Sequence, residues 1–275
     1  MNRRAFIKTA AAATIALPTV GAGLAFAEAV SIRVEHISHR LPNLPSRFEG
    51  MRLAFLTDIH HGPYTNLDYL VRIVRTTMQL QPDVICHGGD FTLRTAKNID
   101  PAFDVLKELA APLGVYGVLG NHDYHYDVEH VKTVLRASGV ELLVNRGVWL
   151  KRGPDRLRLA GVDDAMLGKP NAELALGDCT ARDACVLLSH NPDVAETLDD
   201  PRVGLMLAGH THGGQANIAS FKNPFIPSKY GSKYLRGFAK APSTTVYTSR
   251  GLGMTAVPMR WNCPPELTLL TLTAK

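Results

Sequence analysis

Five short apolar runs, each followed by a loop that carries Asp, His or Asn, constrain the fold of this chain more than any other feature. The loops hold, in chain order, Asp58 with His60, Asp90, Asn121-His122-Asp123, His190, and His210 with His212. Short apolar runs bounded by turn residues are typical of buried strands in layered α/β architectures. Because ligands gather at the carboxyl ends of such strands, we expect these polar side chains to meet at one edge of a sheet.

The stretches between these runs predict a single α/β domain. Amphipathic periodicity predicts helices at 67–80, 101–109, 128–137 and 194–198, and a helical turn at 171–176. Strands are predicted at 31–39, 52–56, 83–86, 114–119, 147–151, 156–162, 184–188, 203–207, 245–249 and 266–272. No linker divides the chain after the first segment, so we expect one domain over residues 28–275.

Residues 1–27 have the pattern of a twin-arginine export signal. Arg3, Arg4 and Lys8 form a basic start, an apolar stretch of small residues follows, and Ala25-Phe26-Ala27 has small residues where a signal peptidase cleaves. The pattern predicts export by the twin-arginine machinery to a periplasmic or other extracytoplasmic location. A retained N-terminal anchor is the alternative, because the apolar stretch is about long enough to span a bilayer.

Charge and cysteine content exclude some other classes of protein. The formal charge is +5, but residues 1–27 hold three basic side chains and no acidic one, which leaves 27 basic against 25 acidic side chains. Such a balance does not predict a nucleic-acid groove. None of the four cysteines forms a Cys-x-x-Cys pair, so a zinc ribbon is not expected. Whether Cys179 and Cys185 form a disulfide is left open.

The side chains that follow the apolar runs predict a metal centre. Carboxylates, imidazoles and an amide together suit Mn²⁺, Fe or Zn²⁺ better than Ca²⁺ or Mg²⁺ alone. Asp58 with His60, and His210 with His212, are i, i+2 pairs, and an extended strand would point both members of each pair to one side. Two metal ions about 3.5–4 Å apart, bridged by a carboxylate and a hydroxide, are a known arrangement for in-line phosphoryl displacement.

These motifs, in this order, resemble the calcineurin-like metallophosphoesterase family. The likeness covers about residues 51–270 and implies a four-layer αββα sandwich, in which two mixed sheets are flanked by helices. The extended motif at 209–215 and the later Ser249-Arg250-Gly251-Leu252-Gly253 resemble a narrower branch. That branch contains exported or membrane-associated phosphodiesterases, including UDP-2,3-diacylglucosamine hydrolases.

The resemblance implies a role for each predicted site residue. One metal ion would be held by Asp58, His60, Asp90 and His212. The other would be held by Asp90, Asn121, His190 and His210, so that Asp90 bridges the two. We expect two divalent ions, with Mn²⁺ ahead of Fe and Zn²⁺. His122 would face the substrate and stabilise charge or protonate the leaving oxygen, with Asp123 orienting it.

Two further residues are candidates for substrate binding. His61 follows the Asp58-x-His60 motif and either reaches the phosphate or lies at the surface. Arg250 lies between a predicted strand and a Gly-rich turn, where it either binds substrate or pairs with a carboxylate. Residues 216–243 interleave basic and aromatic side chains in a long loop, which could contact an anionic lipid surface or pack on itself.

The sequence therefore predicts an exported, metal-dependent phosphodiesterase. It would hydrolyse a phosphodiester or pyrophosphate bond by in-line attack of a hydroxide held between the metal ions. We expect a lipid-linked or envelope substrate. A broad phosphomonoesterase or nucleotidase is the alternative enzyme, and a catalytically silent metal-binding scaffold is the alternative from another class.

Overall fold

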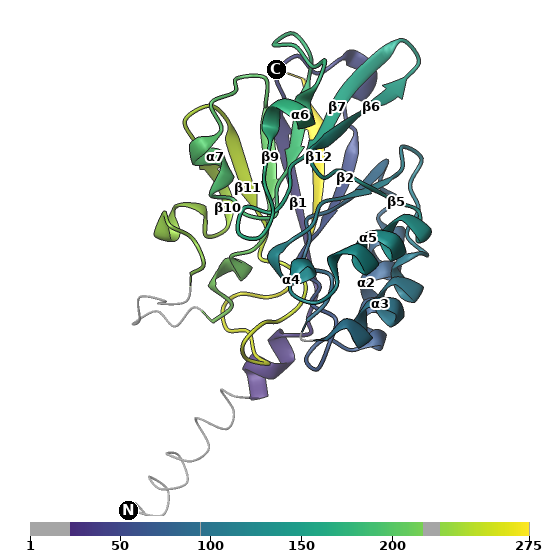
Figure 1. Ribbon diagram of the computed structural model, residues 1–275, viewed down its shortest axis with the longest axis vertical. Coiled ribbons are helices and arrows are strands. Elements are labelled where there is room, and N and C mark those ends of the chain that lie inside the picture. The colour runs from purple at the N-terminus through teal and green to yellow at the C-terminus, as the bar shows by residue number, and fades with distance from the viewer. Residues whose placement is uncertain (1–22, 94, 217–225, 275) are drawn as a thin grey trace, which may run out of the picture.

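The computed structural model describes residues 23–93, 95–216 and 226–274 (Figure 1). The strands are β1 (Arg33–Arg40), β2 (Arg52–Leu56), β3 (Val84–His87), β4 (Val115–Gly117), β5 (Val140–Leu142), β6 (Arg146–Arg152), β7 (Asp155–Gly161), β8 (Cys185–Leu188), β9 (Leu205–Ala208), β10 (Gly237–Lys240), β11 (Thr245–Thr248) and β12 (Glu266–Thr273). The helices are α2 (Leu67–Gln79), α3 (Ile99–Leu106), α4 (Asn121–Tyr124), α5 (Val128–Ala137), α6 (Ala172–Leu176) and α7 (Val194–Thr197).

The strands form two mixed six-stranded sheets. The first has the order β1-β12-β2-β3-β4-β5, and β2 to β5 run parallel, with Leu53 opposite Val84 and Ile85 opposite Val115. The second has the order β10-β11-β9-β8-β7-β6, and its four central strands run parallel. The parallel strands bring many carboxyl ends to the same edge of each sheet, where ligands of α/β proteins bind.

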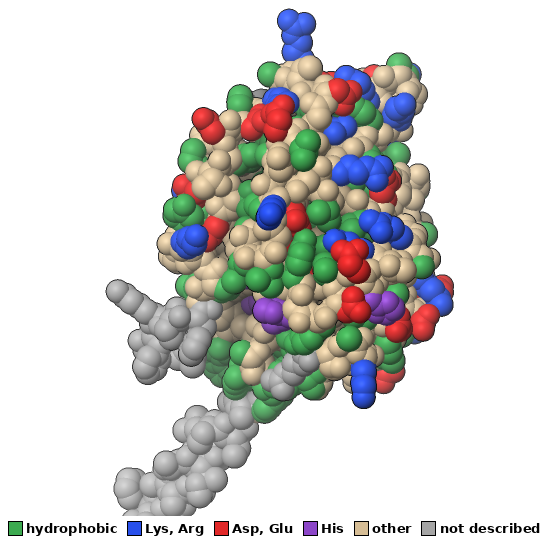
Figure 2. All heavy atoms as spheres, in the orientation of Figure 1, with side chains coloured by type: hydrophobic (Ala, Val, Ile, Leu, Met, Phe, Trp, Pro, Cys, Tyr) green, Lys and Arg blue, Asp and Glu red, His purple; other side chains and the backbone are tan. Residues whose placement is uncertain are grey.

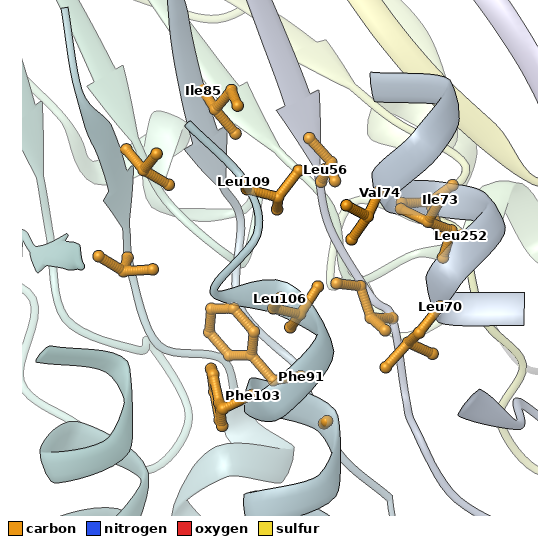
Figure 3. Close-up of a cluster of buried hydrophobic side chains, with 14 of the residues drawn as sticks. Leu56, Leu70, Ile73, Val74, Ile85, Phe91, Phe103, Leu106, Leu109 and Leu252 are labelled. Atoms are coloured by element: carbon orange, nitrogen blue, oxygen red, sulfur yellow. The ribbon is translucent and has the colours of Figure 1, made fainter. Parts of the chain in front are cut away.

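Three apolar layers separate the sheets from each other and from the helices. Side chains alternate along β2, so Leu56 faces α2 and α3 whereas Leu53 faces the second sheet. Figure 3 shows the helix-side layer, where Leu56 and Ile85 pack with side chains of α2 and α3. Leu187 on the outer face of the second sheet packs with residues of α6 and α7. The four-layer αββα sandwich and the two mixed sheets are confirmed.

Three short elements were not predicted from the sequence pattern. β5 and α4 were not expected, and β10 lies inside the segment 216–243 that we expected to be a loop. Part of that segment, residues 217–225, lies outside the described residues. The described part packs on α7, where Ser228 donates a hydrogen bond to Asp193 and the buried Tyr234 donates one to Glu196.

Most of the predicted export signal lies outside the described residues. Residues 23–28 are helical and pack on the chain segment just before β12. Ala25 is buried and accepts a hydrogen bond from the backbone N–H of Arg260, and Glu28 accepts one from that of Cys263. Within the described part of the chain, no helix is both long and apolar enough to cross a membrane.

On the face shown in Figure 2, basic and acidic side chains are interspersed, not gathered by sign.

The four cysteines are buried and free. No disulfide joins Cys179 and Cys185 in this structure.

Candidate metal centre

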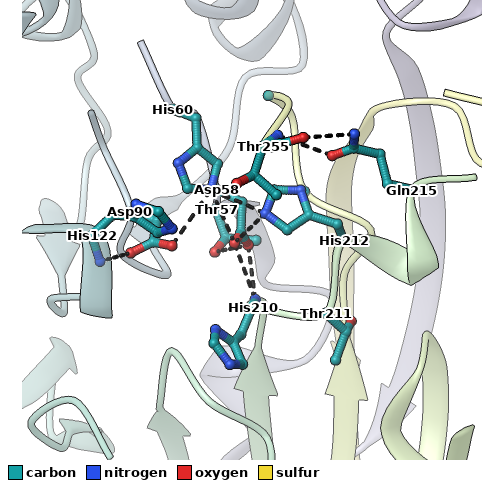
Figure 4. A network of polar contacts seen from close by, with 12 residues as sticks. Thr57, Asp58, His60, Asp90, His122, His210, Thr211, His212, Gln215 and Thr255 are labelled. Atoms are coloured by element: carbon teal, nitrogen blue, oxygen red, sulfur yellow. Dashed lines mark hydrogen bonds and ion pairs between the residues drawn. The ribbon is translucent and has the colours of Figure 1, made fainter. Parts of the chain in front are cut away.

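The loops that follow β2, β3, β4, β8 and β9 meet at one end of the sandwich. Figure 4 shows Asp58 between the rings of His60, His210 and His212, with Asp90 beside them. The structure thus brings together side chains from both sheets, as the sequence pattern led us to expect. The metal-ligand roles given below nevertheless remain predictions.

A first group of ligand atoms lies around Asp58. Its Oδ1 is 3.2 Å from His212 Nε2 and 3.8 Å from His60 Nε2, and the two imidazole nitrogens are 3.0 Å apart. All three side chains are buried. The Thr57 hydroxyl donates a hydrogen bond to Asp58 Oδ2, which orients the carboxylate and leaves Oδ1 facing the histidines.

A second group of ligand atoms lies around Asp90, next to the first. Asp90 Oδ2 is 3.5 Å from His60 Nε2 and 3.2 Å from His190 Nε2, and His190 Nε2 is 3.2 Å from His210 Nδ1. The other oxygen, Asp90 Oδ1, accepts the backbone N–H of His122 at 2.8 Å. Asp90 therefore presents one oxygen to both groups, the position that a bridging carboxylate would occupy.

The donor set fits divalent cations. Ligand atoms of Asp58, His60 and His212, and those of Asp58, Asp90 and His190, lie within 4.8 Å of one another in two overlapping groups. The side-chain oxygen of Asn121 is buried without a hydrogen-bond donor. A buried acceptor without a partner is costly, and a cation would satisfy it. Mixed carboxylate, imidazole and amide donors suit first-row transition metals.

Electrostatics at the centre follow from burial and from the close pairing of acids and imidazoles. Burial opposes ionisation of Asp58, but the charge on His212 lowers its pKa well below the usual value. Burial would lower the pKa of His190, but Asp90 raises it to about 10. Burial lowers the pKa of His60 to about 3. The site therefore keeps Asp58 ionised and His60 neutral, which are the forms that bind metals, whereas His190 is protonated and would release its proton when a cation binds.

The backbone that carries the ligands is not the extended strand that the i, i+2 spacing suggested. The φ angles are 52° at Asp58, 48° at His60, 57° at Asp90, 69° at His210 and 51° at His212. These residues lie in the left-handed region, which non-glycine residues enter at a cost of about 1–3 kcal/mol each. The expected convergence holds, but tight turns after β2, β3 and β9 produce it, not strand alternation.

Asp123 bonds to the backbone and not to the ring of His122. Its Oδ2 accepts the N–H groups of Asp90 and Gly120, and its Oδ1 accepts that of Phe91. Burial, with the charge of Asp90, raises the pKa of Asp123 to about 7. This geometry differs from the expectation that Asp123 orients His122. The carboxylate instead fastens the Asp90 loop to the loop after β4.

The ring of His122 lies at the edge of the metal centre and is partly exposed. It meets the ring of His60 edge-on, with centroids 4.8 Å apart, and also contacts His125. Its ring nitrogens come close enough to His60 and Asp90 to form a third group of ligand atoms. Burial lowers its pKa from the usual value. The substrate-facing role of His122 stays a prediction, and a ligand role is the alternative to exclude.

Arg250 is not available to bind a substrate phosphate in this structure. Its guanidinium forms ion pairs with Glu35 at 2.5 Å and with Glu266 at 3.0 Å. The two carboxylates neutralise the cation and hold it against β1 and β12. Of the two roles expected for Arg250, the structure therefore shows pairing with carboxylates. His61 is buried, and its Nδ1 lies 2.8 Å from the carbonyl oxygen of Thr65. That contact fixes the ring and leaves only Nε2 for a substrate.

Sequence reasoning missed two fully buried charged residues, Asp164 and Arg260. Asp164 follows β7 and is fully buried, with one oxygen accepting the N–H groups of Met166 and Leu167 and the other without a partner. Its position after a parallel strand of the second sheet is the signal that could have found it. Arg260 was also missed, although it is the only charged residue between Arg250 and Glu266.

Fold and site together define a metal-dependent phosphoester hydrolase. The family profile described as calcineurin-like phosphoesterase matches residues 51–214. The chain is 33% identical over 280 residues to the uncharacterized metallophosphoesterase YkuE of Bacillus subtilis, covering 99% of this chain and 98% of that protein. It is 30% identical over 276 residues to the phosphodiesterase YaeI of Escherichia coli, covering 99% of each.

The chain therefore belongs to the calcineurin-like phosphoesterase family. A third relative comes from Danio rerio and is described as a transmembrane protein with metallophosphoesterase domain. It is 34% identical over 257 residues, which cover 87% of this chain and 57% of that protein. Membership of the family and the clustered ligand atoms identify the chain as a hydrolase that acts on phosphoester bonds.

Proposed function

We propose that this hydrolase cleaves a phosphodiester or pyrophosphate bond in a lipid-linked or envelope substrate, with two divalent cations, Mn²⁺ foremost, as cofactors. The observation that carries the two-metal part is the position of Asp90 Oδ2, 3.5 Å from His60 Nε2 and 3.2 Å from His190 Nε2. One carboxylate oxygen thus lies between two sets of ligands. Two bound cations would supply Lewis acidity and an activated water for in-line displacement at phosphorus.

The protein's own residues would hold the substrate in place. A bound phosphate would have Asp58, His60 and His212 on one side. It would have His190 and His210 on the other. His122 lies beside the first side and is partly exposed, so its ring could donate a hydrogen bond to a phosphoryl oxygen or a proton to the leaving oxygen. Its lowered pKa makes the neutral ring the main form, whose N–H can donate a hydrogen bond, whereas transfer of a proton to the leaving oxygen would need the protonated ring.

A diester is proposed as the substrate because of the relatives and the leader sequence. YaeI, which aligns over 99% of both chains, is described as a phosphodiesterase. The lipid part rests on the apolar segment that precedes residue 28 and on the relative described as a transmembrane protein. Contact of residues 216–243 with a membrane surface belongs to the same proposal, as does export by the twin-arginine route to the periplasm or another extracytoplasmic site.

A comparison of substrates tests the substrate class. The purified chain with Mn²⁺ is given bis-p-nitrophenyl phosphate, p-nitrophenyl phosphate, and a lipid-linked pyrophosphate in detergent micelles. We expect kcat/KM to be highest for the lipid-linked substrate and higher for the diester than for the monoester. A preference for the monoester would favour a broad phosphomonoesterase. Equal kcat/KM for bis-p-nitrophenyl phosphate and for the lipid-linked pyrophosphate would remove the lipid part of the proposal.

Fractionation of cells tests the export route. Replacement of Arg3 and Arg4 by Lys keeps the charge of the leader but removes the paired arginines that the export machinery requires. We expect the wild-type chain outside the cytoplasm and the double variant inside it. Cytoplasmic wild-type protein would contradict the proposed location without affecting the enzymatic proposal.

A further inference from the structure

Arg260 is a buried cation that the proposed chemistry does not use. Its side chain is the largest fully buried one in the described part of the chain, and no carboxylate there forms an ion pair with it. The guanidinium stays charged at neutral pH, since its ordinary pKa is above about 12. A buried charge without a counter-ion is costly, so its hydrogen bonds must compensate for the lost hydration.

Backbone carbonyl oxygens on one turn supply most of that compensation. Nη2 donates to the carbonyl oxygens of Arg250, Gly251 and Gly253 at 3.0, 3.1 and 2.5 Å, and Nε donates to that of Gly253 at 3.2 Å. Nη1 donates to the carbonyl oxygen of Cys263 at 3.1 Å. The guanidinium therefore fixes the shape of the turn at residues 250–253.

That turn in turn holds the backbone of Asp58 in its left-handed conformation. The N–H of Leu252 donates to the carbonyl oxygen of Thr57 at 3.0 Å, and that of Gly253 donates to Asp58 at 2.6 Å. The approach is too close for a side chain, because a Cβ on Gly253 would lie 2.0 Å from the carbonyl oxygen of Ile59. Residues 57–59 and the turn are thus packed backbone against backbone.

Arg260 also binds Cys263, which in turn contacts the loop that carries His212. Cys263, whose carbonyl oxygen binds the guanidinium, directs its Sγ to the carbonyl oxygens of His212 at 3.2 Å and Gly213 at 3.4 Å. Arg260 is therefore one residue away from both loops that form the first group of ligands. The path from Arg260 to His210 is longer, because it passes through Asp58, whose Oδ2 accepts the N–H of His210 at 3.0 Å.

We propose that Arg260 is a positioning residue that sets the metal affinity of the group formed by Asp58, His60 and His212. It acts through the backbone and touches neither metal nor substrate. Its planar fork of five donors can bind several carbonyl oxygens at once, which the single ammonium of Lys cannot. This inference rests on the proposed metal centre, and it concerns only the metal position formed by Asp58, His60 and His212.

Metal titration of the full chain tests the proposal. Mn²⁺ binding is measured by calorimetry for the wild type, Arg260→Lys and Gly253→Ala. We expect Arg260→Lys to weaken one of the two binding events by about 10- to 100-fold, the range for residues that orient metal ligands, and to leave the other unchanged. Gly253→Ala, which displaces the turn while Arg260 stays, should weaken the same event.

Arg202→Lys is the matched control. Arg202 is also an arginine with several hydrogen bonds, but it precedes β9 and binds Asp200 and Glu173 of α6, whereas the ligand loop follows β9. It should lower thermal stability without changing either binding event. Equal weakening of both events in Arg260→Lys, or no change in either, would overturn the proposal. If the wild type binds no Mn²⁺, the metal centre itself fails, which is a different result.

Discussion

Five residues at the metal centre hold left-handed backbone conformations, and all five are predicted metal ligands: Asp58, His60, Asp90, His210 and His212. Each is disfavoured by about 1–3 kcal/mol in isolation, so neighbouring contacts must hold it. The N–H of Asp58 bonds to the carbonyl oxygen of Gly89, and that of His60 bonds to Asp90. The loops after β2 and β3 therefore stabilise each other's strained turns.

Replacement of His122 by Ala separates substrate chemistry from metal binding. We expect turnover of a phosphodiester to fall by about 10²–10⁴-fold, the contribution of a positioned general acid, while Mn²⁺ affinity stays the same. Rate assays and calorimetry on one preparation measure both quantities. His36→Ala, an exposed histidine on β1, is the control and should change neither. A loss of Mn²⁺ affinity in His122→Ala would make this residue a ligand.

The sequence predicted which residues gather at the site better than it predicted what each one does there. Asp58, His60, Asp90, His190, His210 and His212 come together because parallel strands deliver their loops to one edge. The bonds of Asp123 to the backbone could not be predicted, and for Arg250 a carboxylate pair was one of two alternatives but its partners were unknown. Their partners, such as Phe91 and Glu35, are distant in the sequence and depend on how the loops fold.

At the scale of elements, Asp123 joins the loop after β3 to the start of α4. Asp123→Asn replaces one carboxylate oxygen by an NH₂ group and leaves at least one of three buried N–H groups without an acceptor. We expect the free energy of unfolding to fall by about 1–3 kcal/mol. Chemical denaturation measures it. Asp127→Asn is the control, because Asn replaces Asp well at the N-cap of α5.

An unchanged stability in Asp123→Asn, together with a large loss of turnover, would contradict the structural role. It would restore the expectation that Asp123 acts through the His122 ring. A loss of stability together with a comparable loss of turnover would support the role of Asp123 in joining the two loops.

The contact between the loops after β2 and β9 depends on Gly209. A Cβ at this position would lie 2.2 Å from Asp58 Oδ2 and 2.3 Å from Thr57 Oγ1. Gly209→Ala must displace the carboxylate, so we expect Mn²⁺ affinity to fall by about 10-fold or more, as for other residues that orient ligands. Calorimetry measures the affinity, and an unchanged value would show that the loop can move aside without cost.

Gly50→Ala is the matched control for this substitution. Gly50 has open space around its Cα but a φ of 76°, so Ala there is strained without any clash. We expect a loss of about 1–2 kcal/mol in stability and no change in Mn²⁺ affinity. The pair therefore separates backbone strain from displacement of a ligand.

The buried apolar runs and the longer periodic stretches could be predicted, whereas β5 and β10 could not. The apolar runs at β2, β3, β8 and β9 and the periodic stretches of α2 and α5 are decided by burial, which the sequence records directly. β5 and β10 have three and four residues, and each is defined by pairing with a distant neighbour. β3, β8 and β9 are as short as β10, but they are fully buried apolar runs, whereas β10 alternates between half-buried and exposed residues.

At the scale of the molecule, the proposed metal centre joins the two sheets. Asp58, His60 and Asp90 belong to loops of the first sheet, whereas His190, His210 and His212 belong to loops of the second. The two-sheet arrangement itself came from the family resemblance, since apolar runs alone do not say which strands share a sheet. Bound cations would therefore connect halves of the sandwich that otherwise meet through an apolar layer.

Removal of metal should lower the stability of the whole domain. A ligand that binds only the folded state stabilises it by about 2.7 kcal/mol when its concentration is 100 times Kd. We expect the melting temperature to fall after treatment with a chelator and to recover when Mn²⁺ is added back. Calorimetric melting of the full chain measures this change. Equal melting temperatures with and without metal would mean that no cation joins the two sheets.

The most direct test of the account is the Mn²⁺ dependence of bis-p-nitrophenyl phosphate hydrolysis by the wild type and by Asp90→Asn. Asp90 Oδ2 lies close to His60 of the first ligand group and to His190 of the second, so replacement of Asp90 should affect both metal positions at once. The account predicts turnover that rises with Mn²⁺ in the wild type and stays near background in Asp90→Asn at every Mn²⁺ concentration. Absence of metal-dependent turnover in the wild type, or full activity in Asp90→Asn, would contradict it.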